Sequence, residues 1–448
     1  MAIRARRGLN LPIAGQPVQS VHDAPLPERV ALMGLDYVGL GPRMHVQEGE
    51  RVVLGQKLFE DRTLDGVNFT APATGTVRAV HRGAKRAFHS LVIDVDSNSD
   101  DAVRFESHKD RADPSREEVQ ALLLESGLWT ALRTRPFSRT PTPGTTPHSI
   151  FVTAVDSHPL APDPQVVLES REEDFERGLS LLGKLTDGPV HLCVGEGSGI
   201  ESGQSGAKRS EFAGKHPYGT VGFHIHMLAP VHSERTVWHI GYQDVARIGH
   251  LFATGELDMS LVVSLAGQAV REPRLLRTRL GADTATLTQN EVEPGELRLI
   301  SGSVLSGTRA MGEVFGYLGR FARQLSVIPE DRERHMLGWT MPGLGRFSSI
   351  PIFLSSLKPQ KRFEMTTSTH GSHRAMVPIG VYERVMPMDL MPTHLLRAIS
   401  VGDVEWATEL GVLELDEEDL SLCTFVCPSK IDFGPALRRV LEEIRKEA

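Results

Sequence analysis

Short apolar runs broken by glycine and proline fill the first hundred residues of this chain. The runs cover residues 30–33, 37–38, 44–46, 51–54, 57–59, 67–70, 76–80 and 91–95. Strands this short and this often interrupted indicate a compact β sandwich or barrel. Glycine-centred turns at 48–50 and 73–76 occupy matching places in two halves, and glycine supplies the positive φ that such turns need. The pattern predicts a β domain over residues 1–105 with an internal quasi-repeat.

The pattern changes after a polar stretch at 96–114, expected to be a linker, and a proline-rich loop at 136–147. A buried strand is predicted at 150–155, then a helix from the spacing of Phe175, Leu179 and Leu182, then a second strand at 190–194. With the glycine-rich residues 195–199 after it, this order indicates a parallel βαβ unit. A helix at 243–252 and a strand at 261–265 follow. We expect an α/β domain over residues 106–256. The glycine-rich loop lacks the spaced fingerprint and the downstream acid of a dinucleotide site.

The remainder of the chain becomes β-rich and then helical. Strands are expected around residues 275, 280, 287 and 297–300, which predicts a small β-rich domain over 257–330. Beyond it we expect a helical domain over 331–448. Its last helix begins after Gly434-Pro435 and is expected to dock on its own protein. The acidic run at 416–419 is expected to open a helix, where carboxylates favour the positive end of the dipole.

Charge and cysteine content narrow the class of protein. The formal net charge is -8, from 49 Lys and Arg against 57 Asp and Glu, so the chain is not expected to recruit nucleic acid. No apolar stretch approaches the roughly 18 residues of a membrane span, and the start lacks the apolar core of a secretory signal. The three cysteines, Cys193, Cys423 and Cys427, are too few to staple the chain. We expect a cytoplasmic protein.

The turns and strands at 48–77 resemble the barrel-sandwich hammerhead of biotinyl and lipoyl carrier domains. A swinging arm needs a lysine amine at the hairpin tip to form its amide. The hairpin region at 61–66 has no lysine. We therefore expect a structural scaffold and no covalent carrier function, which an added mass on a lysine would contradict.

Longer strings carry a family resemblance. Residues 8–15, 37–39, 82–86, 127–130, 340–343, 366–369 and 413–428 resemble the A subunit of the sodium-translocating NADH:quinone reductase, and the match covers nearly the whole chain. The resemblance implies an α/β multidomain fold: a barrel-sandwich hybrid domain (1–105), a Rossmann-like α/β domain (106–256), a soluble-ligand-binding β-grasp (SLBB-type) domain (257–330) and a helical C-terminal domain (331–448). It also implies a peripheral protein on the cytoplasmic face of the cell membrane, which docks on the B subunit beside the other membrane and flavin subunits. The resemblance implies that this complex is a translocase. It passes electrons from NADH through flavins and iron-sulfur centres, held on other subunits, to ubiquinone, and it exports Na+.

The architecture is similar to the flavin-bearing NADH subunit of respiratory complex I and to the C subunit of the Rnf ion pump. In both, a Ser-Gly-Leu lead precedes a glycine-rich loop, whose bare backbone can approach a flavin phosphate. Here Ser126-Gly127-Leu128 precedes Trp129, Pro136 and Phe137, which would obstruct a phosphate cradle. We therefore expect no FMN on this chain.

A four-iron cluster needs four thiolates, and the segment from Cys423 to Cys427 supplies two, with Cys193 far away. No histidine near Cys427 completes a zinc site. A histidine group (His216, His224, His226, His232 and His239) offers another candidate. His224 and His226 alternate on an expected strand and would share a face, as metal ligands often do, but polar packing is favoured. We expect no catalytic, cofactor-binding or metal-binding residue, and no independent activity of the chain alone.

A quinone ring needs an apolar, aromatic slot with a few hydrogen-bond donors. Two segments, residues 32–37 and residues 129–137, combine apolar and aromatic side chains with hydrogen-bond donors. Seven of their residues are predicted to lie near ubiquinone: Leu32, Met33, Tyr37, Trp129, Arg133, Arg135 and Phe137. The competing interpretation is inter-domain packing. The alternative function is a free-standing flavin-dependent NADH dehydrogenase, which would be yellow when purified.

Overall fold

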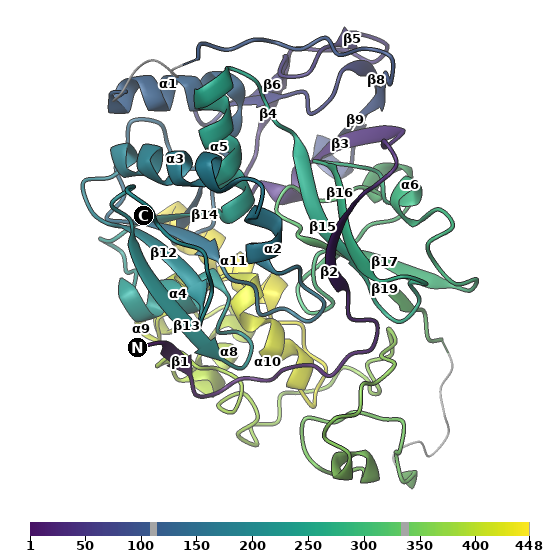
Figure 1. The fold of residues 1–448 in the computed structure, drawn as a ribbon. Coiled ribbons are helices and arrows are strands. Elements are labelled where there is room, and N and C mark those ends of the chain that lie inside the picture. The colour runs from purple at the N-terminus through teal and green to yellow at the C-terminus, as the bar shows by residue number, and fades with distance from the viewer. Residues whose placement is uncertain (108–113, 333–339, 448) are drawn as a thin grey trace.

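The computed structural model describes residues 1–107, 114–332 and 340–447, and the strands among them form four sheets (Figure 1). The mixed α/β multidomain fold class is confirmed. Residues 108–113 of the predicted linker lie outside the described residues.

The first domain is a sandwich of two small antiparallel sheets. One sheet has the order β3 (Arg29–Met33), β9 (Phe88–Val95), β8 (Gly75–Arg82) and β5 (Arg51–Val52), and the other has β4 (Pro42–Met44), β6 (Lys57–Asp61) and β7 (Asn68–Thr70). Between them Phe59 and Phe69 stack with ring centroids 4.6 Å apart. The strand expected at 37–38 is wrong. The 3-10 helix η1 (Gly34–Asp36) follows β3, its C-terminal cap is Tyr37, and residues 37–38 form a bend and a turn.

The second domain is a six-stranded sheet in the order β1-β13-β12-β11-β14-β10. Strands β11 (Ile150–Ala154) and β12 (Val190–Gly195) pair in parallel, as the βαβ pattern predicts. Val152 lies in the core with α3 (Glu172–Leu182) and α5 (Tyr242–Thr254), whereas Phe151 lies in the core with α4 (Val221–Leu228). Alternate side chains of one strand thus fill both faces of the sheet. The remaining elements are β13 (Lys208–Gly214), β14 (Val237–Gly241), β10 (Arg133–Arg135), α1 (Arg116–Ser126), η3 (Leu128–Ala131), α2 (Pro164–Leu168) and η4 (Gly183–Leu185).

Helices α3 and α5 pack unusually closely. A Cβ on Gly178 would lie 2.0 Å from the Val245 oxygen, and one on Gly249 would lie 1.8 Å from the Asp174 oxygen. Only glycine permits this approach of the two backbones.

The third domain is a mixed sheet in the order β18-β17-β19-β15-β16-β2. Its strands are β15 (Ser260–Ala266), β16 (Arg274–Arg279), β17 (Leu297–Ser301), β18 (Thr308–Arg309) and β19 (Gln324–Pro329), with α6 (Thr284–Thr288) and α7 (Gly312–Phe315) beside them. The strand expected around Leu287 is wrong, because Asp283 caps α6 by accepting from the Thr286 amide and Leu287 lies inside that helix.

The N-terminal segment links the three units. Strand β1 (Ile3–Ala5) pairs with β13 in the α/β sheet, and β2 (Val18–Asp23) pairs with β16 in the third sheet. The chain enters the sandwich only at β3, so residues within the range predicted for the first domain complete the other two sheets. The predicted domain boundaries stay predictions.

The C-terminal region is helical from Pro392 onward. It contains α8 (Pro392–Val401), α9 (Val404–Glu409), η7 (Val412–Glu414), η8 (Glu417–Leu420), α10 (Ser421–Val426) and α11 (Gly434–Glu447). Leu437, Val440 and Leu441 of α11 are buried in one core with α4, which confirms that the last helix docks on its own protein. Residues 340–391 are irregular apart from the 3-10 helix η6 (Leu354–Leu357), so the helical character expected throughout 331–448 is wrong for this stretch.

Candidate functional site

The two segments singled out as quinone candidates meet in the structure. Helix η1 follows β3, and η3 follows α1 at Gly127, whose φ of 80° caps α1. A Cβ on Gly127 would lie 2.7 Å from the Thr70 hydroxyl, so glycine lets η3 sit directly on β7. This contact brings η3 of the second domain beside the end of β3 in the first.

A small cavity lies where the segments meet. Its volume is about 40 Å3, and Leu32, Met33, Tyr37, Leu128 and Thr130 are among its lining residues. The space holds a few water molecules at most, since one water needs roughly 10–15 Å3 by the same measure. A quinone ring therefore enters this cavity only if the lining moves.

Two buried charged residues, Asp36 and Arg320, line this cavity. Asp36 accepts from the Arg320 amide at 2.8 Å, and burial raises the pKa of the Asp36 carboxyl to about 6. The Arg320 guanidinium lies 2.7 Å from Oδ1 of Asp244, and the Arg323 guanidinium lies 3.0 Å from Oδ2 of the same carboxylate. Burial opposes ionisation of Asp244, but the arginines, led by Arg320, hold its pKa below the ordinary value.

A larger cleft of about 450 Å3 lies on the other side of the same segments. Its lining includes Asp36, Arg133, Thr153, His239, Tyr242 and Phe321. The cleft opens where β11 and β14 end, and the strand order reverses between these two strands. Open α/β sheets bind ligands at such a reversal, because loops there diverge to opposite faces.

Arg133 and three buried polar atoms give this cleft its chemistry. The Arg133 guanidinium carbon lies 4.1 Å from the centre of the Phe321 ring, a cation–π contact. Among the described residues, Thr153 Oγ1, His239 Nε2 and Tyr242 Oη are buried without a hydrogen-bond partner. Burial and then Arg133 push the pKa of His239 well below its ordinary value, so its ring is neutral. Such orphaned groups favour a polar ligand or water in the cleft.

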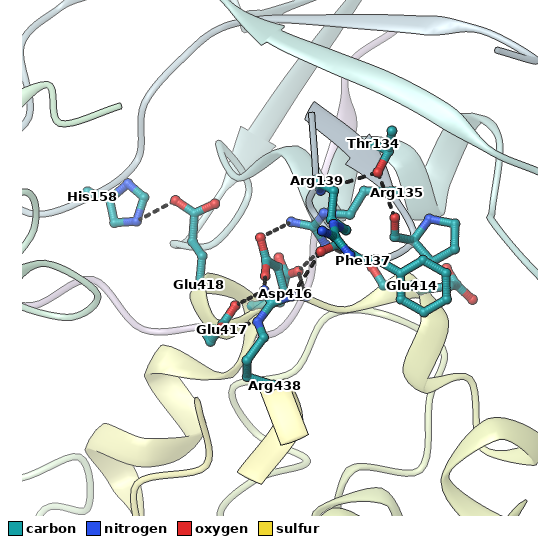
Figure 2. Close-up of polar contacts among 12 residues, drawn as sticks. Thr134, Arg135, Phe137, Arg139, His158, Glu414, Asp416, Glu417, Glu418 and Arg438 are labelled. Carbon is teal, nitrogen blue, oxygen red and sulfur yellow. Dashed lines mark hydrogen bonds and ion pairs between the residues drawn. The ribbon is translucent and has the colours of Figure 1, made fainter. Parts of the chain in front are cut away.

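An ion-pair network joins the C-terminal region to the α/β domain (Figure 2). Its residues Asp416, Glu417 and Arg438 also line the cleft. Arg135 of β10 donates to Asp419 at 2.9 Å and lies 3.4 Å from Asp416. Arg438 of α11 contacts Asp416 and Glu417 at 2.5 Å each, and it donates to the Phe137 carbonyl at 2.9 Å. The acidic run does open η8, as predicted, through a capping box at Asp416.

Neighbouring groups shift the ionisation of this network. Burial, and then the bonded Asp416, raise the pKa of Glu417 to about 7 against the opposing charge of Arg438. His158 lies 2.8 Å from Asp156 and 3.3 Å from Glu418. Burial alone would lower the pKa of His158, but Asp156 and Glu418 raise it to about 9.

Three family models match this chain. They are the NqrA N-terminal barrel-sandwich hybrid domain at residues 3–96, the NqrA second alpha/beta domain at 114–257 and the NQRA C-terminal domain, an SLBB model, at 262–312. A curated relative, the A subunit of the Na(+)-translocating NADH-quinone reductase of Cellvibrio japonicus, is 54% identical over 99% of this chain and 100% of its own length.

The chain belongs to the NqrA family. The Serratia proteamaculans protein of the same name is 52% identical over the same shares of the two chains. Among solved structures, an NAD+-reducing [NiFe]-hydrogenase in the H2-reduced state matches 50% of each chain at 13% identity, with a TM-score of 0.35 that is too low to carry an argument. In the described part of this NqrA family member, no helix combines the length and the apolar character needed to cross a bilayer.

The residues predicted near quinone take three different places in this family member. Leu32, Met33 and Tyr37 line the small cavity, and Arg133 lines the cleft. Trp129 is fully buried, packs edge-on against Trp238 at 5.4 Å, and donates from its indole nitrogen to the Pro141 carbonyl.

Arg135 is buried in the ion-pair network, and Phe137 packs beside the C-terminal core. With Trp129, these two side chains are engaged in packing between units. Sequence reasoning missed Phe321 and Tyr242, whose places in the cleft depend on contacts across domains.

The histidine and cysteine candidates are used in packing. His224 and His226 lie on helix α4, so the prediction that they share a strand face is wrong. His224 contacts the Tyr218 carbonyl at 3.0 Å, and His226 contacts Glu414 at 2.8 Å. Cys427 lies 3.2 Å from the Tyr382 hydroxyl. Within the described ranges, no three His, Cys, Asp or Glu side chains gather in a way that could hold a metal ion.

Proposed function

We propose that this chain is the peripheral A subunit of a Na+-translocating NADH:quinone reductase, which couples NADH oxidation and ubiquinone reduction to Na+ export. The observation that carries the proposal is the full-length identity of over half its residues with a curated A subunit. The chain sits on the cytoplasmic face of the membrane and docks on the B subunit. Co-purification from detergent-solubilised membranes, with each subunit identified, tests the proposal. Recovery of the chain free of other subunits would refute it.

The chain contributes binding surface and not a redox centre of its own. Where the fold's flavin-bearing counterparts have a glycine-rich loop, this chain has the η3 turn, and Trp129 fills the space against Trp238. Cys423 and Cys427 are the two thiols of their segment, and burial raises the pKa of Cys423, which disfavours the thiolate that metals require. Flavins and iron-sulfur centres belong to the other subunits of the complex.

We propose that the quinone head group binds in the cleft, whose lining includes residues of the α/β and third domains. Phe321 supplies an aromatic face, Arg133 supplies a cationic donor, and the Tyr242 hydroxyl supplies a second donor for a carbonyl oxygen. From the first segment, Leu35 and Val38 line the cleft, whereas Leu32, Met33 and Tyr37 line the neighbouring small cavity. Asp36 of η1 lines both spaces. A neutral quinone suits this environment, since its ring requires aromatic contact and its carbonyls require hydrogen bonds.

A photoreactive quinone analogue tests this placement in the assembled complex. The expected result is label on peptides that contain residues 32–37 or 129–137. Label confined to another subunit would remove the quinone role and leave this chain with assembly alone.

A further inference from the structure

Residues 340–363 have a charge composition opposite to that of the rest of the chain. They contain Arg346, Lys358, Lys361 and Arg362 and no Asp or Glu, in a chain whose net charge is -8. The next acid is Glu364, at the end of the stretch. The stretch therefore forms a local cationic surface on an anionic protein.

The same stretch exposes large apolar side chains. Leu357 is 77% exposed and Ile352 is 68% exposed, although a soluble surface gains nothing from such residues in a group. Met341, Leu344 and Leu354 are each about half exposed or more. Figure 1 shows this part of the chain, in green, projecting from the lower edge of the body.

The projecting segment is fixed at its base. Phe363 is buried, and its amide donates to the Pro12 carbonyl at 2.7 Å. Phe347 stacks on Phe425 of α10 with ring centroids 6.4 Å apart. Between these anchors lies a groove of about 110 Å3 whose lining includes Phe347, Phe353, Phe363 and Lys358. An apolar slot with a cation at its edge suits an acyl chain below an anionic head group.

We propose that residues 340–363 bind the surface of an anionic phospholipid membrane. The inference rests on the proposed function, because a peripheral subunit of a membrane complex works beside a lipid surface. Exposed leucine and isoleucine side chains enter the interface between head groups and acyl chains. Lys358 and Arg362, the exposed cations, remain at the phosphates. The remaining charge of the protein is repelled by anionic lipid, so this stretch determines which face approaches the membrane.

The charge pattern favours lipid over a protein partner as the occupant. A protein surface would present acids at fixed positions, whereas Lys358 and Arg362 stand on exposed, irregular backbone without a matching acid in the stretch. A fluid leaflet accepts such an arrangement, since its phosphates move to the cations. The exposed apolar side chains can insert into the lipid leaflet without a complementary pocket to receive them.

Vesicle sedimentation with the full-length chain tests the proposal. The wild type is expected to sediment with vesicles of phosphatidylglycerol and phosphatidylethanolamine and much less with vesicles of phosphatidylcholine alone. Lys358→Gln with Arg362→Gln should lower the partition coefficient about 25-fold, since each cation near the surface contributes about fivefold. Leu354→Ser with Leu357→Ser should lower it at least about tenfold.

A matched control removes one exposed apolar residue and one exposed cation elsewhere. Val401→Ser with Lys215→Gln should leave vesicle binding unchanged, because both side chains are exposed and lie outside the stretch. A wild type that fails to bind anionic vesicles, or variants at 354 and 357 that bind as well as the wild type, would overturn the proposal. Co-purification of the same variants with the complex separates the two ideas. If they lose assembly while the wild type ignores lipid, the stretch docks on a protein and the proposed function stands.

Discussion

Arg135→Met is expected to loosen the C-terminal region from the α/β domain. The Arg135 side chain is 1% exposed and faces Asp419, whose side chain is fully buried. Its guanidinium also donates to the Glu414 carbonyl at 3.0 Å. The variant leaves Asp419 buried with the Asp416 amide, at 2.9 Å, as its remaining hydrogen-bond donor, and burial already raises the pKa of Asp419. Removing one member of a buried pair costs about 3–5 kcal/mol, because the remaining charge stays desolvated.

Hydrogen exchange on the full chain measures this cost locally, which suits a protein of several domains that is not expected to unfold in one step. Amides of α10 and α11 should exchange at least about a hundredfold faster in Arg135→Met than in the wild type. The double variant Arg135→Met with Asp419→Leu should recover part of the protection, because no unpaired charge remains.

Arg277→Met is the matched control, since Arg277 pairs with Asp23 on the surface and exposed pairs stabilise little. Unchanged protection of α10 and α11 in Arg135→Met would show that the network does not fasten the C-terminal region.

Three further predictions concern other parts of the molecule. His158→Gln should change the pH dependence of stability: the pKa of His158 is about 9 in the folded chain against 6.5 ordinarily, so its stabilisation is full below 6.5 and lost as pH rises through 9. Hydrogen exchange of the amides around η8 measures the free energy of local opening, and the difference in this free energy between wild type and variant should shrink by about 3 kcal/mol over that range. A difference that stays constant with pH would contradict this. Gly127→Ala should destabilise the protein by about 1–3 kcal/mol more than Gly144→Ala. Gly144 has a similar φ of 81°, but a Cβ added there would meet no atom within 4 Å. Equal shifts in melting temperature for the two variants would show that the Thr70 contact is unimportant. Arg133→Met should lower photolabelling of the cleft about tenfold while Arg177→Met, on the exposed face of α3, leaves it unchanged; equal labelling would remove Arg133 from the quinone site.

Local patterns predict the elements whose side chains repeat with one clear period. Phe175, Leu179 and Leu182 indicated α3, and the buried strands on either side indicated the parallel pair of β11 and β12. The strand prediction for His224 and His226 is wrong because they lie on α4, whose Val221, Phe223 and Ile225 alternate with small or polar residues as side chains do in a strand. Only eight residues long, this helix shows too few turns for its period to appear.

The parts of the site that sequence could not supply depend on distant partners. Arg135 and Asp419 are separated by 284 positions, and no pattern in the sequence around either residue indicates that the two form an ion pair. Strand β1 is three residues long and pairs with β13 some two hundred residues later, so no local signal marks it as an edge of the α/β sheet. Segments 32–37 and 129–137 could be chosen by composition. Packing between the domains determines which of their side chains line a cavity. Trp129 is buried, whereas Arg133 lines the cleft.

Quantifying flavin, iron and acid-labile sulfide on the isolated full-length chain tests most directly whether this subunit lacks a redox centre of its own. We expect a colourless protein with all three far below one equivalent, alongside a cofactor-bearing complex when the chain is purified with its partners. Stoichiometric flavin or iron bound to the chain alone would contradict this conclusion.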